Sequence, residues 1–459
     1  MNLTDKIPES LDDLLKFKLV CTCGKTHSVD LLGISLRNNA LDDIITYVRK
    51  IGNKLSIALI MDNITKFICG YRVNKLLNKD GHKTVQIVIP NNAGNKPYAN
   101  EEGLKNAEMK LENIDLAIAV GCGTINDLTK LASFRKGIPY IVVVTAPSMN
   151  GFTSAIAAIS INGIKRTIEC HQPIAVIADL LILQNAPIQL ISSGLGDLES
   201  KPTCTADFKL AGILRNEYYC SIPEQIVTRA EKKVSESVFG LKYRDPESIK
   251  ILMEALLISG ISMKMAGSSS PASGGEHLIS HFWDMTADQE GRVEGYHGEQ
   301  VGVATIVSSS LYEYLRNLLP QDIKISAIIK NRPNLQDLKQ EITGYFGENA
   351  HLVSTEFLKK YYTNGQLEVE LSYIRENWYD IWNKLDSNLR SSKQIRDTLK
   401  TAGCPVTVHE LGLTPGHLRR SLFAARFIRN RFTVLDFASN LGILQEAGET
   451  VLINSGCLN

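Results

Sequence analysis

The sequence has no excess of charge of either sign and no long apolar run. Its 459 residues include 50 lysines and arginines and 49 aspartates and glutamates, which gives a formal net charge of +1. Because no overall field attracts the chain to nucleic acid or to an anionic membrane, we expect neither as a partner. No stretch of about 18 uninterrupted apolar residues exists, so we expect no transmembrane helix.

A signal peptide and a disulfide framework are also missing. The N-terminal stretch MNLTDKIPESLDDLLKFKLV contains acids and has no apolar core segment. The nine cysteines are odd in number and scattered along the chain. These absences predict a protein of the reducing cytoplasm. A length of 459 residues allows two or three domains with a large buried core.

The first part of the chain alternates apolar strands with helix-compatible segments. We predict strands at 56–62, 84–90, 114–123 and 139–147, a hairpin at 155–170 around Asn162-Gly163, and a further strand at 174–180. Strands that are almost continuously apolar predict a parallel sheet covered on both faces. From about residue 186 onward the pattern is helical. We therefore predict an α/β domain over residues 1–185 and an all-helical domain over 186–459.

Two motifs follow neighbouring predicted strands. VGCGTINDLTK (120–130) brings a strand into Gly121 and Gly123 directly before a helix, and TAPSMNGFTS (145–154) ends the next strand. Glycines let the backbone approach a pyrophosphate closely, and ligands of parallel sheets bind at the carboxyl ends of strands. The motifs predict a nucleotide cleft, with ordinary tight turns as the alternative, because no third glycine completes the dinucleotide fingerprint.

Three separated segments each offer a metal donor. These are Asp197 in GLGDLESK, His277 in GEHLISHFWDM and His297 in EGYHGEQVG. Two imidazoles and a carboxylate with one vacant position are typical of a catalytic divalent metal site. His281 lies four residues after His277, on the same helix face. That spacing also occurs on polar helix faces that bind no metal.

Five ordered motifs carry a resemblance to a known family. GCGTINDLTK, TAPSMNGFTS, GLGD, PASGGEHLISHFWDM and YHGEQVG resemble the sn-glycerol-1-phosphate dehydrogenases of the iron-containing alcohol dehydrogenase and dehydroquinate-synthase-like superfamily. The resemblance extends from about residue 20 to about residue 310. It implies a Rossmann-like nucleotide-binding domain followed by a helical metal-binding domain, NAD or NADP as cofactor, and one divalent metal, with zinc ahead of nickel or iron. We expect a small-molecule substrate and a homo-oligomer.

The resemblance also assigns residues. It places Asp197, His277 and His297 on metal-ligand positions and His281 on a substrate-contacting position. Many family members have an aspartate where this chain has Asn150. The amide keeps hydrogen-bonding reach but has no charge, which weakens the assignment of glycerol 1-phosphate itself as substrate. The catalytic set is thus His281, Asn150 and Asp197, and the cofactor set is Gly121, Gly123, Thr124, Ile125, Asn126, Asp127, Thr145, Ala146, Pro147, Ser148 and Ser154.

The function predicted in this way is the NAD(P)-linked interconversion of sn-glycerol 1-phosphate and dihydroxyacetone phosphate. One alternative is a dehydroquinate-synthase-like sugar-phosphate cyclase, for which only Lys201 and Arg292 offer extra phosphate contacts. The other is a nucleotide-binding relative that has lost catalysis. Asp62, at a strand end, is either a ribose-binding acid or a plain strand end, so the choice between NAD and NADP stays open.

One further cluster stands apart from these motifs. Cys21, Cys23 and His27 in CTCGKTH are soft metal donors at close spacing. No fourth ligand is evident from the sequence, and a structural turn is the alternative.

Overall fold

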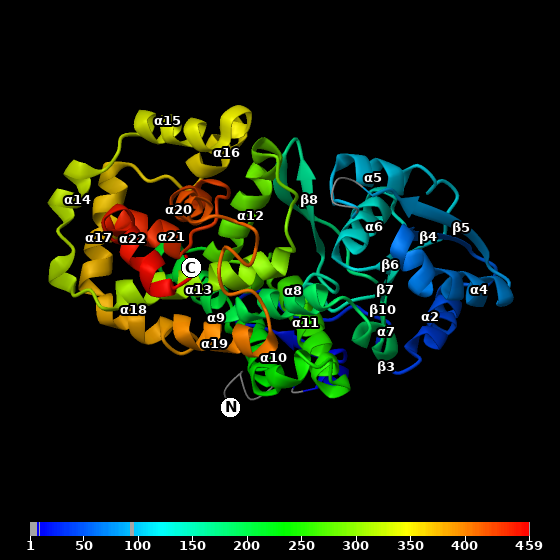
Figure 1. Cartoon of the computed structure of the whole chain (residues 1–459). Helices are drawn as coiled ribbons and strands as arrows, with labels where there is room; N and C mark the ends of the chain where they lie inside the picture. The colour runs from blue at the N-terminus through cyan, green and yellow to red at the C-terminus, as the bar shows by residue number, and fades with distance from the viewer. Residues whose placement is uncertain (1–6, 9, 92–95, 459) are drawn as a thin grey trace. The chain divides into compact units, whose positions relative to one another are not determined.

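The computed structural model describes residues 7, 8, 10–91 and 96–458 (Figure 1). The chain forms two compact units. The first comprises Met1–Leu198 and Ser221–Ser269, and the second comprises Glu199–Cys220 and Ser270–Asn459. The sequence predicted one boundary near residue 185, which is where the strands end. The units divide later because two long helices after that point pack with the first unit.

A six-stranded parallel sheet forms the centre of the first unit. Its strand order is β3-β10-β7-β6-β4-β5. Strands β6, β7 and β10 are buried along their whole length, as expected for a sheet covered on both faces. The predicted parallel sheet is confirmed, although edge strand β3 was not predicted. The bounds are β3 (Gly33–Arg37), β4 (Ser56–Asp62), β5 (Lys83–Ile89), β6 (Leu116–Gly121), β7 (Tyr140–Val144) and β10 (Ala175–Asp179).

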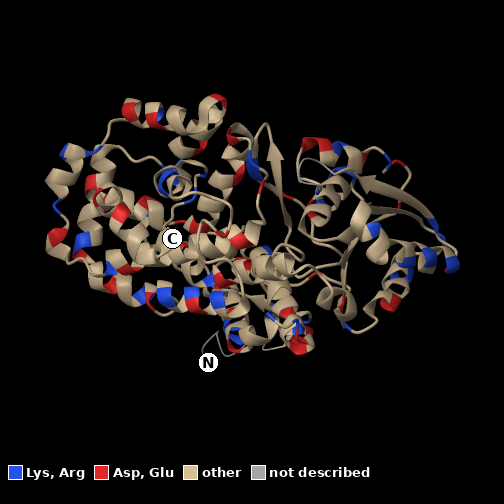
Figure 2. Cartoon of the chain, in the orientation of Figure 1, with Lys and Arg blue, Asp and Glu red and all other residues tan. Residues whose placement is uncertain are grey.

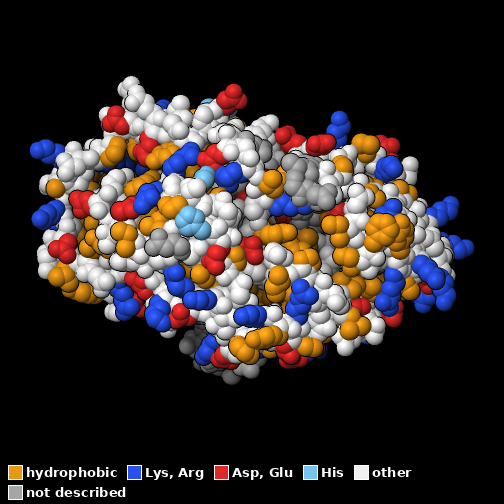
Figure 3. All heavy atoms as spheres, viewed as in Figure 1, with side chains coloured by type: hydrophobic (Ala, Val, Ile, Leu, Met, Phe, Trp, Pro, Cys, Tyr) orange, Lys and Arg blue, Asp and Glu red, His pale blue; other side chains and the backbone are white. Residues whose placement is uncertain are grey.

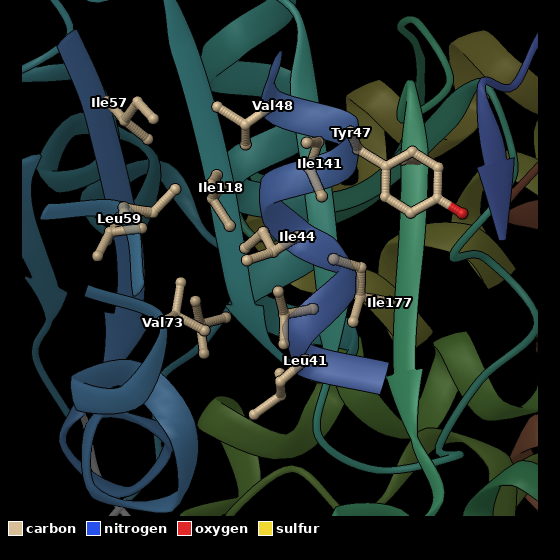
Figure 4. Close-up of a cluster of buried hydrophobic side chains, with 14 of the residues drawn as sticks. Leu41, Ile44, Tyr47, Val48, Ile57, Leu59, Val73, Ile118, Ile141 and Ile177 are labelled. Carbon is tan, nitrogen blue, oxygen red and sulfur yellow. The ribbon is translucent and has the colours of Figure 1, made fainter. Parts of the chain in front are cut away.

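Alternate side chains of these strands build the apolar core. On one face Ile118, Ile141 and Ile177 pack against Ile44 and Val48 of α2 (Ile44–Ile51), as Figure 4 shows. The strand residues between them are buried on the opposite face, where α6 (Gly123–Lys136) covers β6 and its neighbours. Successive side chains of a strand point to opposite faces of the sheet, so every second side chain lies on the same face.

Two antiparallel hairpins complete the strands of the first unit. β8 (Ile156–Ile161) and β9 (Ile164–Glu169) pair around Asn162 and Gly163, whose φ angles are 51° and 70°. Positive φ at both residues is what a type I′ turn requires, so the predicted hairpin is confirmed. The second hairpin, β1 (Lys18–Val20) with β2 (Thr26–Ser28), carries the CTCGKTH segment.

The remaining elements of the first unit are helices. The two longest, α10 and α11, pack along each other (Figure 1). The bounds are α1 (Leu11–Leu14), α3 (Asn63–Thr65), α4 (Tyr71–Lys79), α5 (Glu101–Glu108), α7 (Leu180–Gln184), α8 (Ile188–Glu199), α10 (Ser221–Leu241) and α11 (Pro246–Ala266).

The second unit contains helices and no strand among its described residues. This confirms the prediction of a helical second part. None of the helices described is long and apolar enough to cross a membrane. The bounds are α9 (Lys201–Arg215), α12 (Gly275–Ala287), α13 (His297–Arg316), α14 (Ile325–Asn331), α15 (Leu335–Phe346), α16 (Ala350–Leu358), α17 (Asn364–Glu376), α18 (Trp378–Leu385), α19 (Ser392–Ala402), α20 (Pro415–Ala424), α21 (Val434–Asn440) and α22 (Ile443–Ser455).

Charged residues are distributed over both units. Basic and acidic residues are interspersed along the ribbon in Figure 2, and apolar side chains separate them on the face shown in Figure 3. The sequence has nearly equal numbers of basic and acidic residues, and the two kinds are also mixed along the helices and strands.

Helix α8 packs unusually close to the loop after β7. A Cβ atom on Gly194 would lie 1.8 Å from the carbonyl oxygen of Pro147. Gly194→Ala should therefore force the helix and the loop apart and lower the free energy of unfolding by about 3 kcal/mol. The matched control is Gly344→Ala in α15, where a Cβ would meet nothing within 4 Å. That change should stabilise the chain by about 0.5–1 kcal/mol. Urea denaturation measures both, and equal effects of the two substitutions would contradict the close packing.

Candidate functional site

The glycine loop places a helix N-terminus at the carboxyl end of the sheet. Strand β6 ends at Gly121, and α6 begins at Gly123 after an extended Cys122 that gives no side-chain capping bond. A Cβ on Gly121 would lie 2.7 Å from Cβ of Ile125, so this glycine allows close strand–helix packing. Gly123 and Thr124 are partly exposed. The first turn of α6 can therefore offer backbone N–H groups to a phosphate.

The loop after β7 lies beside the glycine loop. Thr145 donates its backbone N–H to the Gly121 carbonyl at 3.1 Å, and a Cβ on Gly123 would lie 3.0 Å from Sδ of Met149. Thr145, Ala146, Pro147 and Ser148 are buried. The structure thus brings together the two segments that were predicted to bind the cofactor, because β6 and β7 are neighbouring parallel strands.

The next residues of α6 contact the protein interior. Ile125 and Asn126 are fully buried, and Asn126 Nδ2 donates to Asp127 Oδ1 at 3.0 Å. Asp127 Oδ2 accepts the Ala158 backbone N–H at 3.0 Å. These side-chain contacts hold α6 against β8. The assignment of Asn126 and Asp127 to cofactor binding remains a prediction.

Lys130 is a buried cation that the sequence analysis did not identify. Its Nζ donates to the carbonyls of Gly151 and Ile156 at 2.8 Å and to Ser154 Oγ at 3.2 Å, and lies 3.6 Å from Asp127 Oδ1. Burial lowers the pKa of Lys130, against the opposing charge of Asp127. The lysine ends the motif GCGTINDLTK three residues after Asp127, a spacing that places the two side chains on one helix face.

Asn150 holds the carboxylate of Asp197. Its backbone N–H donates to Oδ2 and its Nδ2 donates to Oδ1, both at 2.8 Å. Asp197, on α8, is 1% exposed. The two bonds orient both carboxylate oxygens from the side of the loop after β7.

Three histidines cluster in the second unit. His277 and His281 lie one turn apart on α12, and His297 is the first residue of α13. The ring centroids of His277 and His297 are 5.3 Å apart, and those of His281 and His297 are 5.5 Å apart with the rings stacked. All three are among the residues predicted to form the site, and the structure brings them together.

Neighbouring side chains fix the tautomers of two of these histidines. His277 Nδ1 lies 2.9 Å from Glu276 Oε1, and His297 Nδ1 lies 3.1 Å from Ser280 Oγ, which itself donates to Gln300 Oε1. With Nδ1 as the donor, each neutral ring carries its lone pair on Nε2. Metal-binding histidines characteristically donate their second ring nitrogen in this way. The donor set therefore fits a divalent metal.

The structure adds residues that the motifs did not single out. Glu276 is fully buried and accepts bonds from the Gly274 N–H at 2.6 Å and from Thr203 Oγ1 at 2.9 Å. Asp284 forms a second possible ligand set with His281 and His297, whose donor atoms all lie within 4.8 Å of one another. The only sequence signal for these residues is their place in GEHLISHFWDM, next to or one turn from a histidine.

Asp62, Lys201 and Arg292, which the sequence offered as possible binding residues, each form hydrogen bonds or ion pairs within the protein. Asp62 caps α3 through bonds from the N–H groups of Ile64 and Thr65, at 2.8 and 2.7 Å. Lys201 Nζ donates to Ser200 Oγ and to the Ala272 carbonyl. The guanidinium of Arg292 pairs with Glu290 at 2.5 Å. These contacts engage both basic groups that the sugar-phosphate cyclase alternative would use.

Comparisons with known proteins identify the family. Residues 35–187 match the iron-containing alcohol dehydrogenase family. A glycerol-1-phosphate dehydrogenase [NAD(P)+] of Geobacillus thermodenitrificans is 30% identical over 431 residues, which cover 93% of this chain and 97% of the relative. The chain belongs to the glycerol-1-phosphate dehydrogenase family. The family's Bacillus subtilis enzyme is 35% identical over 292 residues, 63% of this chain and 74% of its own length.

Solved structures agree with the family's fold. Glycerol dehydrogenase from Schizosaccharomyces pombe aligns with a TM-score of 0.58 at 16% identity, covering 93% of this chain and 92% of its own. An archaeal alcohol dehydrogenase from a Red Sea brine pool aligns with a TM-score of 0.54. Membership of the glycerol-1-phosphate dehydrogenase family confirms the predicted resemblance, the fold class and the prediction of an NAD(P)-linked dehydrogenase.

The Asn150–Asp197 contact gives a test that depends on pH. Asn150→Asp replaces the Nδ2 donor by a second carboxylate beside Asp197. In metal-free protein this should cost about 1–3 kcal/mol of unfolding free energy, because the buried carboxylates repel each other. This repulsion raises the pKa of the carboxyl pair, and protonation at low pH relieves it. The loss should therefore grow as the pH rises from about 5 to about 8.

Asn150→Ala is the matched control, because it removes the amide without adding a charge. Urea denaturation in the presence of a chelator measures both variants at the two pH values. A difference between the two variants that does not change with pH would show that residue 150 and Asp197 are not electrostatically coupled.

Proposed function

We propose that the chain interconverts dihydroxyacetone phosphate and sn-glycerol 1-phosphate, with NAD or NADP as the hydride carrier. The 30% identity to a glycerol-1-phosphate dehydrogenase, in an alignment that covers 93% of the chain, supports this substrate. The structural observation that carries the proposal is the pair His277 and His297, each with its Nδ1 held by a neighbouring side chain. This arrangement suits a metal-dependent dehydrogenase.

The proposed metal ligands are Asp197, His277 and His297. A divalent metal held by them would supply Lewis-acid polarisation of the substrate oxygen. Two imidazoles and one carboxylate with an open position favour zinc, with nickel and iron as alternatives. Asn150 positions the Asp197 carboxylate, and Glu276 and Ser280 position the two imidazoles.

The remaining roles fall to the loops of the sheet and to His281. The first turn of α6, from Gly123, binds the cofactor's pyrophosphate, and Thr145–Ser148 line the rest of its pocket. Bound NADH or NADPH supplies the hydride. His281, one turn from His277, delivers the proton to the substrate oxygen during reduction and accepts it during oxidation. A homo-oligomer in the cytoplasm, without nucleic-acid or membrane partners, remains our prediction for the assembled enzyme.

Oxidation of NADH and of NADPH by the purified chain tests the substrate assignment. We expect turnover with dihydroxyacetone phosphate and little with unphosphorylated dihydroxyacetone. The product should resist a dehydrogenase specific for sn-glycerol 3-phosphate. Equal rates with both ketones would instead indicate a polyol dehydrogenase. Conversion of a sugar phosphate without net consumption of the nicotinamide cofactor would indicate the cyclase alternative.

Substitution of the histidines tests the metal assignment. His277→Ala should lower metal content and abolish turnover, because a site with three protein ligands loses one. His281→Ala should retain the metal and the nucleotide but lose about a hundredfold or more in rate, because the proton donor is gone. Elemental analysis and steady-state kinetics measure both effects.

The control for the second ligand set is Asp284→Asn, which should leave metal content unchanged. If His281→Ala and Asp284→Asn both lose the metal while His277→Ala keeps it, the ligands are His281, Asp284 and His297, and the proposed set is wrong.

A further inference from the structure

The hairpin β1–β2 brings together donors that neither the dehydrogenase motifs nor the proposed mechanism uses. Leu19 pairs with His27 and Val20 with Thr26, so CTCGK forms the connection between two three-residue strands. A two-stranded hairpin of this size is marginally stable by itself. Val20 is 79% exposed, so this position adds little apolar burial.

The connection turns so that both cysteines and the histidine face one volume. Cys21 donates its N–H to the Lys25 carbonyl at 3.0 Å and accepts the Gly24 N–H at 3.1 Å. Gly24 has a φ of +85°, a conformation that L residues rarely adopt. Cys23 Sγ lies 3.4 Å from His27 Nε2.

Cys220 supplies a fourth donor. It directly precedes Ser221, the first residue of α10, so the peptide bond keeps its side chain at the N-terminal end of that helix. One donor atom from each of Cys21, Cys23, His27 and Cys220 lies within 4.8 Å of the other three. In a tetrahedral zinc site, sulfur and nitrogen ligands are about 3.5–3.8 Å apart. The limit of 4.8 Å is wider than this spacing, so zinc binding would draw the four donor atoms closer together.

His27 has the orientation of a metal ligand. The ring is fully buried, and its Nδ1 lies 3.2 Å from the Met265 carbonyl in the last turn of α11. Donation from Nδ1 to that carbonyl leaves Nε2, the nitrogen facing Cys23, as the lone-pair position. Lys25 Nζ donates to the adjacent Ala266 carbonyl at 2.5 Å. The hairpin is therefore already fixed to the end of α11.

We propose that Cys21, Cys23, His27 and Cys220 bind a structural zinc ion. Three thiolates and one imidazole form a closed tetrahedral set with no position for substrate, unlike the open dehydrogenase site. The ion joins the hairpin to the start of α10, while the hydrogen bonds of His27 and Lys25 join the hairpin to the end of α11. This role is independent of the proposed substrate and of the metal at Asp197, His277 and His297.

Cobalt substitution of the full chain tests the site without any sequence change. Co²⁺ bound by three thiolates gives an intense thiolate-to-metal charge-transfer absorption, whereas Co²⁺ bound by histidine and carboxylate gives none. We expect this absorption in the wild-type chain and, undiminished, in His277→Ala. Its absence from the wild-type chain loaded with two or more equivalents of Co²⁺, enough to fill both proposed sites, would overturn the proposal.

Paired variants give a second, independent measurement. The double variant Cys21→Ser/Cys23→Ser should contain one equivalent of zinc less than the wild type and lose the charge-transfer band. Cys69→Ser is the matched control, because Cys69, like Cys21, is a buried thiol of the first unit, and burial raises its pKa to about 12. It should retain both metal and band.

Thiol counting separates zinc binding from oxidation. Denaturation with a chelator should release nine reactive thiols per chain, the number of cysteines in the sequence. A lower count that a reductant restores, together with unchanged zinc content in the double variant, would show a disulfide in place of the metal and would overturn the proposal.

Discussion

The hydrogen bonds and the ion pair of the buried Lys130 ammonium group hold together the loops at the carboxyl end of the sheet. A cation removed from water is stable only when its donors are satisfied and its charge is compensated. Lys130 meets both needs by bonding to Gly151, Ser154 and Ile156 and by pairing with Asp127. One side chain of α6 thereby fixes the loop that follows β7 and the start of β8. The loops that we propose to bind the cofactor are thus held in place by contacts within the protein.

The same principle recurs at the proposed catalytic residues. Asn150 orients the Asp197 carboxylate, Glu276 orients His277, and Ser280 orients His297. Each of these proposed ligands shares a hydrogen bond with an outer residue, which limits the rotamers and the tautomers that the ligand can adopt. A histidine held in this way presents Nε2 without rearrangement, which lowers the entropic cost of binding a metal. These outer residues therefore bear on metal affinity although none of them is a proposed ligand.

The two proposed metal sites differ in the chemistry of their donors. The dehydrogenase site combines nitrogen and oxygen donors and leaves a coordination position for substrate, whereas the hairpin site has three sulfur donors and is closed. Sulfur donors suit a reducing environment, in which thiols persist as ligands instead of disulfides. In the proposed hairpin site, these donors would connect the hairpin, where Val20 is 79% exposed, to the start of α10.

The sequence by itself determined the features that local patterns encode. Apolar runs such as 114–123 identified parallel strands, Asn162-Gly163 identified a type I′ turn, and the five motifs identified the family. Tertiary structure alone decided the burial of Lys130, the positioning of His277 by Glu276, and the proximity of Cys220 to Cys21, Cys23 and His27. The spacing of apolar residues along the sequence indicates which face of a helix or strand is buried, because residues on one face recur at a short, regular interval. Which distant side chains meet at that face depends on how the helices and strands pack.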